Sequence, residues 1–209
     1  MNKFIKFLAI TFLIVGGLSL IPRLLNNREK AIVGIPEPSL QKTRGIEDVE
    51  VGGRKFQIEK KYRIETSGLV AVTKKYTGGG FLDTIAPADI VLEWGEAAQY
   101  NDLITYEWIL NDRGVKANIF YSDEAKQILG DFNIYDRLTF NTLIPCDDFV
   151  SEQIKKINKD DYIRLNGYLV DVILPEELKE PAGRWKTGFQ LEDLETWFIY
   201  VTDVEWLEE

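Results

Sequence analysis

Residues 7–22 contain no charged side chain, and this apolar run constrains the fold more than any other feature of the sequence. Extended back to residue 4, with Lys6 reaching toward lipid headgroups, the run approaches the roughly 20 residues that a membrane-spanning helix needs. An uncleaved anchor is favoured, because no Ala-x-Ala cleavage site is present and Arg23 follows at once. A cleaved signal peptide is the alternative, with weak small-residue candidates at residues 15–17. A buried soluble helix is disfavoured, because the run is apolar on every face.

The sequence divides into three parts. Residues 1–26 are assigned to the transmembrane anchor or signal segment, residues 27–45 to a linker and residues 46–209 to one soluble domain. The linker assignment rests on glycine and proline among polar residues, namely Gly34, Pro36, Pro38 and Gly45. The basic residues on the two sides of the apolar run nearly balance, so they do not fix its orientation. Since few residues precede the run, we expect a single-pass protein of the cell membrane, with its domain on the extracytoplasmic (periplasmic) side.

The charge is unevenly distributed along the chain. The formal net charge is −9, from 25 basic and 34 acidic residues. Residues 1–30 hold five of the basic residues and one of the acidic ones, which leaves 20 against 33, or −13, for residues 31–209. A domain of this charge is repelled by phosphate backbones, so we expect no nucleic-acid partner.

The residue types exclude several chemistries. The chain has no histidine and a single cysteine, Cys146, so Ser-His-Asp and Cys-His catalysis and His/Cys zinc sites are absent. No intrachain disulfide can form. Two acidic pairs, Asp147-Asp148 and Asp160-Asp161, lack the ligand spacing of a calcium loop. The three glycines at residues 78–80 lack the Lys-Ser/Thr that a phosphate-binding loop needs, and they predict a turn. We expect neither a metal nor a cofactor.

Alternating apolar and polar residues predict a domain of short strands. The pattern indicates a strand from Phe56 after a Gly-Gly turn, a hairpin over residues 104–121 with its turn at 111–114, and a last strand over residues 197–206. In the strand over residues 162–174 the apolar phase slips at Gly167, which predicts a bulge or a barrel corner.

Short helices are predicted between these strands, at residues 87–98, 123–129 and 147–157. Ser122 and Gly130 bound the second of them as caps. The fold class expected is mainly β (α+β): an N-terminal transmembrane helix, then a small OB-like β-barrel or half-barrel with two or three short helices.

Three segments, at residues 85–96, 140–145 and 157–172, together resemble an uncharacterised family of bacterial proteins with an N-terminal membrane segment and one extracytoplasmic domain. The matching residues are Pro87, Asp89, Trp94 and Gly95, then Asn141, Ile144 and Pro145, and then Gly167, Tyr168, Leu169 and Val170. The chain departs from the family at Leu143, where the family has histidine, and at Asp160, where glycine is common; the family's Gly- and Cys-containing ending is not recognisable either. The resemblance implies a location and an architecture, and it brings no established activity.

Six residues are candidates for contact with a ligand or partner: Asp89, Trp94, Gly95, Asn141, Pro145 and Tyr168. On a helix, Asp89 and Glu93 would share a face and offer a pair of carboxylates for acid–base chemistry, although surface solvation is the simpler interpretation. The Trp94-Gly95 pair is typical of a tryptophan that packs on a strand and fixes a loop. Asn141 is either a turn former or a ligand contact. No residue is assigned a catalytic role.

Three functions remain open. The first is a non-catalytic binding or assembly module that recognises a protein or envelope partner and is held to the membrane by its N-terminal helix. The second is a carboxylate-dependent hydrolase that acts on envelope glycans or peptides. The third is an OB-type nucleic-acid binder, which the charge of −13 disfavours.

Overall fold

The computed structural model describes residues 30–111, 113–175, 184–187 and 196–208. The chain divides into two compact units, residues 1–30 and residues 31–209, and the elements named below belong to the second. The expected anchor or signal segment, residues 1–26, lies outside the described residues. Within the described ranges, no helix is both long enough and apolar enough to cross a membrane.

Strands make up most of the second unit. They are β1 (Ser39–Val51), β2 (Arg54–Lys75), β3 (Ala88–Glu93), β4 (Ile104–Asn111), β5 (Gly114–Tyr121), β6 (Leu138–Pro145), β7 (Tyr162–Ile173), β8 (Arg184–Trp185) and β9 (Thr196–Trp206). The α-helices are α2 (Phe81–Ile85), α3 (Gly95–Gln99), α4 (Asp123–Leu129) and α5 (Asp148–Ile154), and two 3-10 turns are η1 (Asn101–Leu103) and η2 (Ile134–Arg137). The predicted mainly-β class is therefore confirmed.

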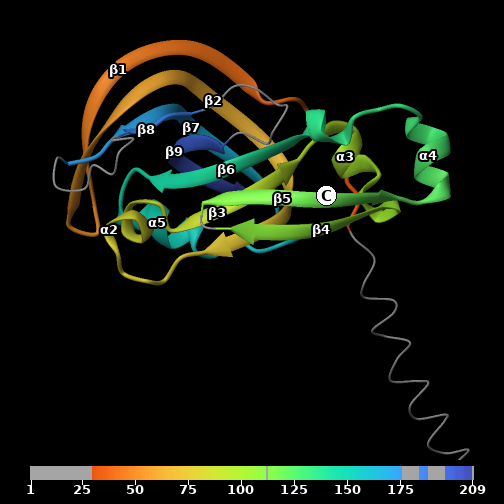
Figure 1. The fold of residues 1–209 in the computed structure, drawn as a ribbon. Helices are drawn as coiled ribbons and strands as arrows, with labels where there is room; N and C mark the ends of the chain where they lie inside the picture. The colour runs from red at the N-terminus through yellow and green to blue at the C-terminus, as the bar shows by residue number, and fades with distance from the viewer. Residues whose placement is uncertain (1–29, 112, 176–183, 188–195, 209) are drawn as a thin grey trace, which may run out of the picture. The chain divides into compact units, whose positions relative to one another are not determined.

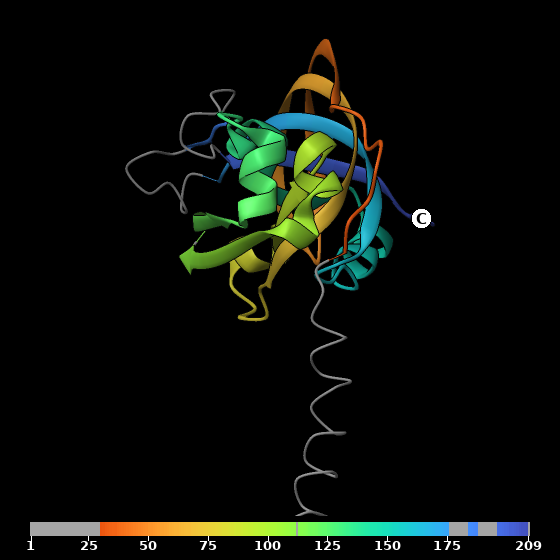
Figure 2. The same cartoon turned by 90° about the vertical axis from the view of Figure 1, so that its right-hand side faces the viewer.

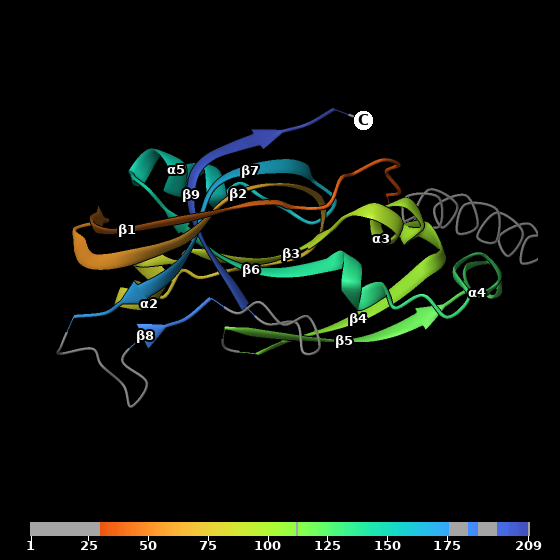
Figure 3. The same ribbon diagram turned by 90° about the horizontal axis from the view of Figure 1, so that it is seen from above.

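Five strands pair in a closed circuit, β2-β3-β6-β9-β7, which returns to β2. The circuit closes because β2 is long enough to pair with two neighbours: its residues 57–69 lie against β7 and its residues 69–75 against β3. The β6–β9 pair is parallel, and the other pairs of the circuit are antiparallel. β1 lies against the first half of β2, and β8 adds to the end of β7 (Figures 1 and 3).

Apolar side chains from all five strands of the circuit fill its interior. They form one cluster, in which the strands contribute Ile64, Val70, Ala88, Ile90, Leu92, Leu143, Ile163, Leu165, Leu169, Ile199 and Val201. Helix α5 packs its buried Val150 and Ile154 into the same cluster. The Asp147 carboxylate caps this helix by accepting a hydrogen bond from the Val150 amide at 2.8 Å.

The β4–β5 hairpin covers the outer face of β3 and β6. Val91, Leu138 and Phe140 form a second apolar cluster, and hairpin side chains pack on it: Tyr106, Trp108, Val115, Ile119 and Tyr121. As a result, every residue of β3 and of β6 is buried, as expected for strands covered on both faces. Figure 1 shows the hairpin running beside these strands, and Figure 2 shows it from the end where α3 and α4 lie.

Several local predictions are confirmed. The hairpin begins and ends as predicted, and Ser122 caps α4 by accepting a hydrogen bond from the Ala125 amide at 3.0 Å. The pairing of β7 with β9 shifts register between Asn166 and Gly167, where the apolar phase slips in the sequence. At Gly167 a Cβ atom would lie 2.1 Å from the carbonyl oxygen of Tyr200, so only glycine allows this approach of the two strands.

Other predictions were wrong. The helix predicted for residues 87–98 is strand β3 followed by the short helix α3, because both faces of residues 88–93 are buried and the apolar pattern of that segment carries no single period. The described residues contain four α-helices rather than two or three. Helix α2 is the addition: it begins at Phe81 after Gly80, a residue with no side chain to signal a cap. Residues 39–45, taken from the sequence as linker, form the first part of β1.

Candidate functional site

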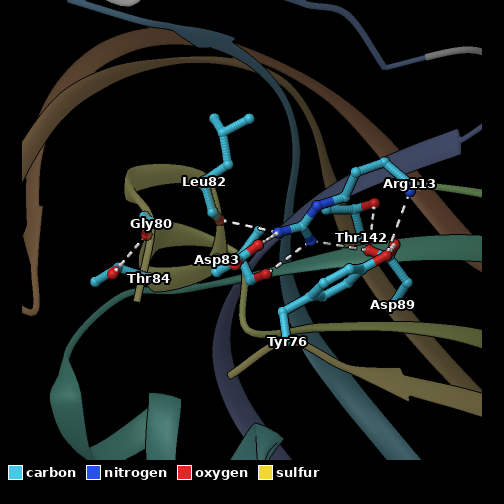
Figure 4. A network of polar contacts seen from close by, with 9 residues as sticks. Tyr76, Gly80, Leu82, Asp83, Thr84, Asp89, Arg113 and Thr142 are labelled. Carbon is cyan, nitrogen blue, oxygen red and sulfur yellow. Dashed lines mark hydrogen bonds and ion pairs between the residues drawn. The ribbon is translucent and has the colours of Figure 1, made fainter. Parts of the chain in front are cut away.

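Asp89 lies on β3, under the hairpin, and its carboxylate is almost fully enclosed. Its side chain is 2% exposed. The Tyr76 hydroxyl donates to Oδ2 at 2.6 Å, and the Thr142 hydroxyl on β6 donates to Oδ1 at 2.8 Å. Thr142 is the direct cross-strand partner of Asp89, so the sheet register itself supplies this donor. Figure 4 shows both hydroxyls pointing at the carboxylate.

Arg113 supplies the positive charge beside Asp89. It comes from the turn of the hairpin, and its Nη1 lies 3.4 Å from Asp89 Oδ1. The same guanidinium donates to the carbonyl oxygens of Ala86 and Leu82 at 2.7 and 3.0 Å, and its Nη2 lies 3.2 Å from Asp83 Oδ1. One arginine therefore ties the tip of the hairpin to the α2 segment and to β3 (Figure 4).

Tyr76 sits between these groups. The Arg113 guanidinium lies over its ring, with Cζ 3.6 Å from the ring centroid, a cation–π distance. Burial, and then the hydrogen bond to the negatively charged Asp89, hold the pKa of Tyr76 well above its usual value near 10. Its hydroxyl thus stays protonated and remains a donor. We call Tyr76, Asp83, Asp89, Arg113 and Thr142 the Asp89 cluster.

Of this cluster, the sequence pointed to Asp89 alone. The other four members, Tyr76, Asp83, Arg113 and Thr142, were missed, because their meeting depends on contacts between distant segments. Arg113 lies within the turn predicted at residues 111–114, where an arginine is ordinarily solvated. No local pattern in the sequence connects these residues to Asp89.

Glu93 and Asp89 do not share the one face of a helix that the sequence had suggested, because both lie on strand β3. Both residues point outward toward the hairpin, with Val91 between them in the covered apolar cluster. Glu93 is 0% exposed. The pair of accessible carboxylates considered from the sequence is therefore not formed.

Trp94 and Gly95 lie at the opposite end of β3 from Asp89 and fix the segment that precedes β1. Trp94 packs with Ile32 and Ile35, and the Gly95 amide donates to the Ile35 carbonyl at 3.0 Å. The Arg137 guanidinium lies 4.6 Å from the Trp94 ring centroid, and Gly95 adopts a φ of 53°, which favours glycine. This pair packs against its surroundings as the sequence indicated.

The remaining candidates lie apart from one another. Asn141 is 0% exposed and points into the circuit, where its Nδ2 donates to the Thr139 carbonyl at 2.9 Å. Its Oδ1 has no hydrogen-bond partner among the described residues. Pro145 is buried at the end of β6, opposite Val201 of β9. Tyr168 on β7 is half-buried beneath the Lys60 ammonium, 4.2 Å from its ring centroid. The six candidates do not form one site.

Two of the open clefts on the described surface have a volume of about 740 Å³ each. The first, the α5 cleft, lies between the β1–β2 turn, the segment that carries α2, and α5. Tyr76 and Asp83 of the Asp89 cluster line it, together with charges of both signs on Lys75, Asp148, Glu152 and Lys155. The second, the β1–β2 cleft, is lined by Lys42, Thr43, Arg44, Gly45, Ile46, Glu59, Lys60, Lys61, Tyr62, Asp171, Lys186 and Thr187. In the described part of the chain, no three acidic or cysteine side chains gather closely enough to hold a metal ion.

Cys146, which follows β6, is expected to react slowly. Burial, and then the neighbouring Asp147 carboxylate, raise the pKa of its thiol to about 11. We expect the rate of its alkylation by iodoacetamide to keep rising up to pH 11 in the folded chain. In the urea-unfolded chain the rate should level off near the ordinary thiol pKa of about 8.5.

The raised pKa of Cys146 also makes the stability of the folded chain depend on pH. The unfolded chain loses the thiol proton first, so stability should fall as pH rises between these two pKa values. Since Cys146 is the single cysteine, one adduct by mass spectrometry reports it directly. Equal rates for folded and unfolded chain at pH 9 would contradict the shifted pKa.

Comparisons with protein-family models, with curated proteins and with solved structures gave no match to this chain.

Proposed function

We propose that the chain is a non-catalytic binding or assembly module, held by its N-terminal segment at the outer face of the cytoplasmic membrane, that recognises a protein or envelope partner. The apolar run at residues 7–22 and the resemblance in the three segments support the location. The observation that carries the non-catalytic part is the burial of both candidate carboxylates, since Asp89 is 2% exposed and Glu93 is 0% exposed.

The strand circuit supports an OB-like barrel as the scaffold. An OB-fold is a five-stranded barrel that binds ligands on the face of its second and third strands and through the loops around it. In this chain β2 takes the part of the long first strand, and β3 and β6 correspond to the second and third. Helix α5 precedes β7, the fourth strand of the circuit in chain order.

The customary ligand face of such a barrel is covered here. The hairpin packs on β3 and β6 through the apolar cluster around Val91 and Phe140, and Arg113 fastens its tip. Stacking of bases on this face, as in an OB-type nucleic-acid binder, would require the hairpin to leave. This cover and the negative charge both weigh against the nucleic-acid hypothesis, and they favour recognition through another surface.

The hydrolase remains the second candidate, and Asp89→Asn tests it. The asparagine keeps the size of the side chain, and its oxygen can still accept from Thr142 and Arg113. The module hypothesis predicts that purified wild-type and D89N chains release the same background of soluble fragments from isolated cell-envelope material. Release by the wild type that disappears in a folded D89N chain would favour the hydrolase and overturn the proposal.

Binding itself can be tested in cells with a photoreactive amino acid. Ile46 on β1 is 68% exposed, and Ile109 on the hairpin is 48% exposed. If the module recognises its partner away from the covered face, a photoreactive residue at Ile46 should give a discrete crosslinked product to an envelope component. The same residue at the buried Val91 serves as the control and should give none. Absence of a product from every exposed position would contradict a binding role.

A further inference from the structure

The β1–β2 cleft is cationic on a domain that is otherwise strongly acidic. Five basic side chains line it, on Lys42, Arg44, Lys60, Lys61 and Lys186, against two carboxylates, Glu59 and Asp171. The whole chain carries a net charge of −9, so a gathering of positive charge in one hollow is unexpected from composition. Such a hollow concentrates the field of its cations, because its walls exclude part of the solvent.

The basic residues of the cleft fall into two groups. Lys60 is ion-paired with Glu47, and Lys61 is ion-paired with Glu59 at 2.6 Å and with Asp171 at 3.3 Å. Among the residues that the structure describes, the other three form no ion pair with a carboxylate: Lys42, Arg44 and Lys186. The cleft therefore holds three positive charges that are available to a ligand.

The backbone around the cleft is irregular at the same place. Residues 43 and 44 of β1 stand opposite the single residue Lys61 of β2, which makes a bulge in that pair. The pairing of β2 with β7 also shifts register between Lys60 and Tyr62. Bulges interrupt the ladder of backbone hydrogen bonds and re-aim side chains, and they occur preferentially beside functional sites. Two of them meeting at Lys61 open the sheet where the cations gather.

Hydrogen bonds link residues that line the cleft to the neighbouring strands. The Asp171 carboxylate accepts a hydrogen bond from the Thr187 amide at 3.1 Å, and the Thr187 hydroxyl accepts one from the Phe198 amide of β9 at 3.3 Å. The Lys60 ammonium is held over the Tyr168 ring. Tyr168, a candidate partner residue from the sequence, thus acts by holding a lysine of this cleft.

We infer that the β1–β2 cleft binds a phosphate-bearing ligand of about the size of a sugar phosphate, with Lys42, Arg44 and Lys186 as the charges that hold it. Three available donors match the three terminal oxygens and the double charge of a phosphate monoester better than the two oxygens of a carboxylate. The volume of about 740 Å³ falls in the range of small-molecule sites and exceeds what a bare phosphate fills. A soluble metabolite and a lipid headgroup can both carry a phosphate monoester, and the recognition chemistry is the same for the two sources.

The test uses the full chain purified in nonionic detergent, with calorimetric titration. The soluble probe is glycerol 3-phosphate, and the lipid probe is phosphatidic acid in mixed micelles, because both carry a phosphate monoester. Glycerol and acetate, which lack a phosphate, and phosphatidylcholine micelles, whose phosphate is a diester, serve as controls. The variant K42A/R44A removes two of the three available cations, and both side chains are exposed, so the fold should survive. The matched control K116A/K126A removes two cations from the hairpin and α4, away from the cleft.

We expect one of the two phosphate probes to bind, with an affinity that falls as salt is added. K42A/R44A should weaken it at least about tenfold, and K116A/K126A should leave it unchanged. Binding of glycerol 3-phosphate would identify a soluble ligand, and binding of phosphatidic acid alone a lipid headgroup. If neither probe binds, or if K42A/R44A binds as well as the wild type, the inference is overturned. The assay uses purified chain, so its failure leaves the proposed location and partner untouched.

Discussion

Arg113→Ala should lower the free energy of unfolding by about 3 kcal/mol, because it leaves the buried Asp89 carboxylate without a positive partner. It also removes the donors to the Ala86 and Leu82 carbonyl oxygens. Urea denaturation followed by tryptophan fluorescence measures the loss. Hydrogen exchange should show where it acts, with the amides of β4 and β5 exchanging faster than those of β7.

Two further variants separate the ion pair from general damage. Arg63→Ala removes an exposed arginine of β2 and should change stability by less than about 0.5 kcal/mol. In the double variant D89N/R113A a neutral amide replaces the carboxylate, so no buried charge is left without a partner. The loss of unfolding free energy should therefore be smaller than the sum of the losses in the two single variants. Additive losses would show that Arg113 and Asp89 do not interact, and an Arg113→Ala chain as stable as the wild type would show that the guanidinium does not fasten the hairpin.

Gly167→Ala should be at least as damaging, because the added Cβ would meet backbone and not a movable side chain. It would lie 2.1 Å from the Tyr200 carbonyl oxygen and 3.2 Å from the Val201 Cα. To fit it, β7 and β9 must separate where their register shifts, and we expect a loss of about 3 kcal/mol or more. Thermal and urea unfolding of the purified chain measure it.

Gly114→Ala and Gly45→Ala are the matched controls for that substitution. Each glycine lies in a strand, and a Cβ atom at either position would meet no atom within 4 Å. Both variants should unfold within about 1 kcal/mol of the wild type. A Gly167→Ala chain that resembles these controls would mean that the close approach of β7 and β9 is not required.

Sequence reasoning succeeded where local signals decide structure. The hairpin of β4 and β5 alternates cleanly because one of its faces packs on the barrel and the other meets solvent. Helix α4 has a capping serine at its start and a glycine with a φ of 57° at its end. The irregularity at Gly167 could be predicted because a bulge moves the apolar residues of a strand from one alternating phase to the other.

Prediction from the sequence failed where contacts between distant segments decide the structure. Asp89 and Glu93 are four residues apart, which suggested one face of a helix, but the hairpin at residues 104–121 covers a strand there and buries both. The first part of β1, residues 39–45, was taken for linker because the strand lies at a sheet edge and most of its residues are exposed, so no apolar alternation marks it. The candidate site was incompletely predicted for the same reason. Tyr76 and Arg113 are partners of Asp89, and no local sequence pattern connects either of them to it.

Together these features give the hairpin a definite place in the functional proposal. It occupies the face that an OB-like barrel would ordinarily offer, and the Asp89 cluster holds it there. The surfaces left for recognition include the β1–β2 cleft, whose charge is opposite to that of the domain. A module that meets an envelope partner must, however, be on the correct side of the membrane.

The most direct test of the proposal is protease accessibility of a C-terminal tag on the full chain in intact spheroplasts, with membrane and soluble fractions blotted together. We expect a full-length, membrane-bound species whose tag is digested from outside without lysis. A tag that stays protected until the spheroplasts are lysed would place the domain in the cytoplasm. That result would contradict the proposal of an extracytoplasmic module with an envelope partner.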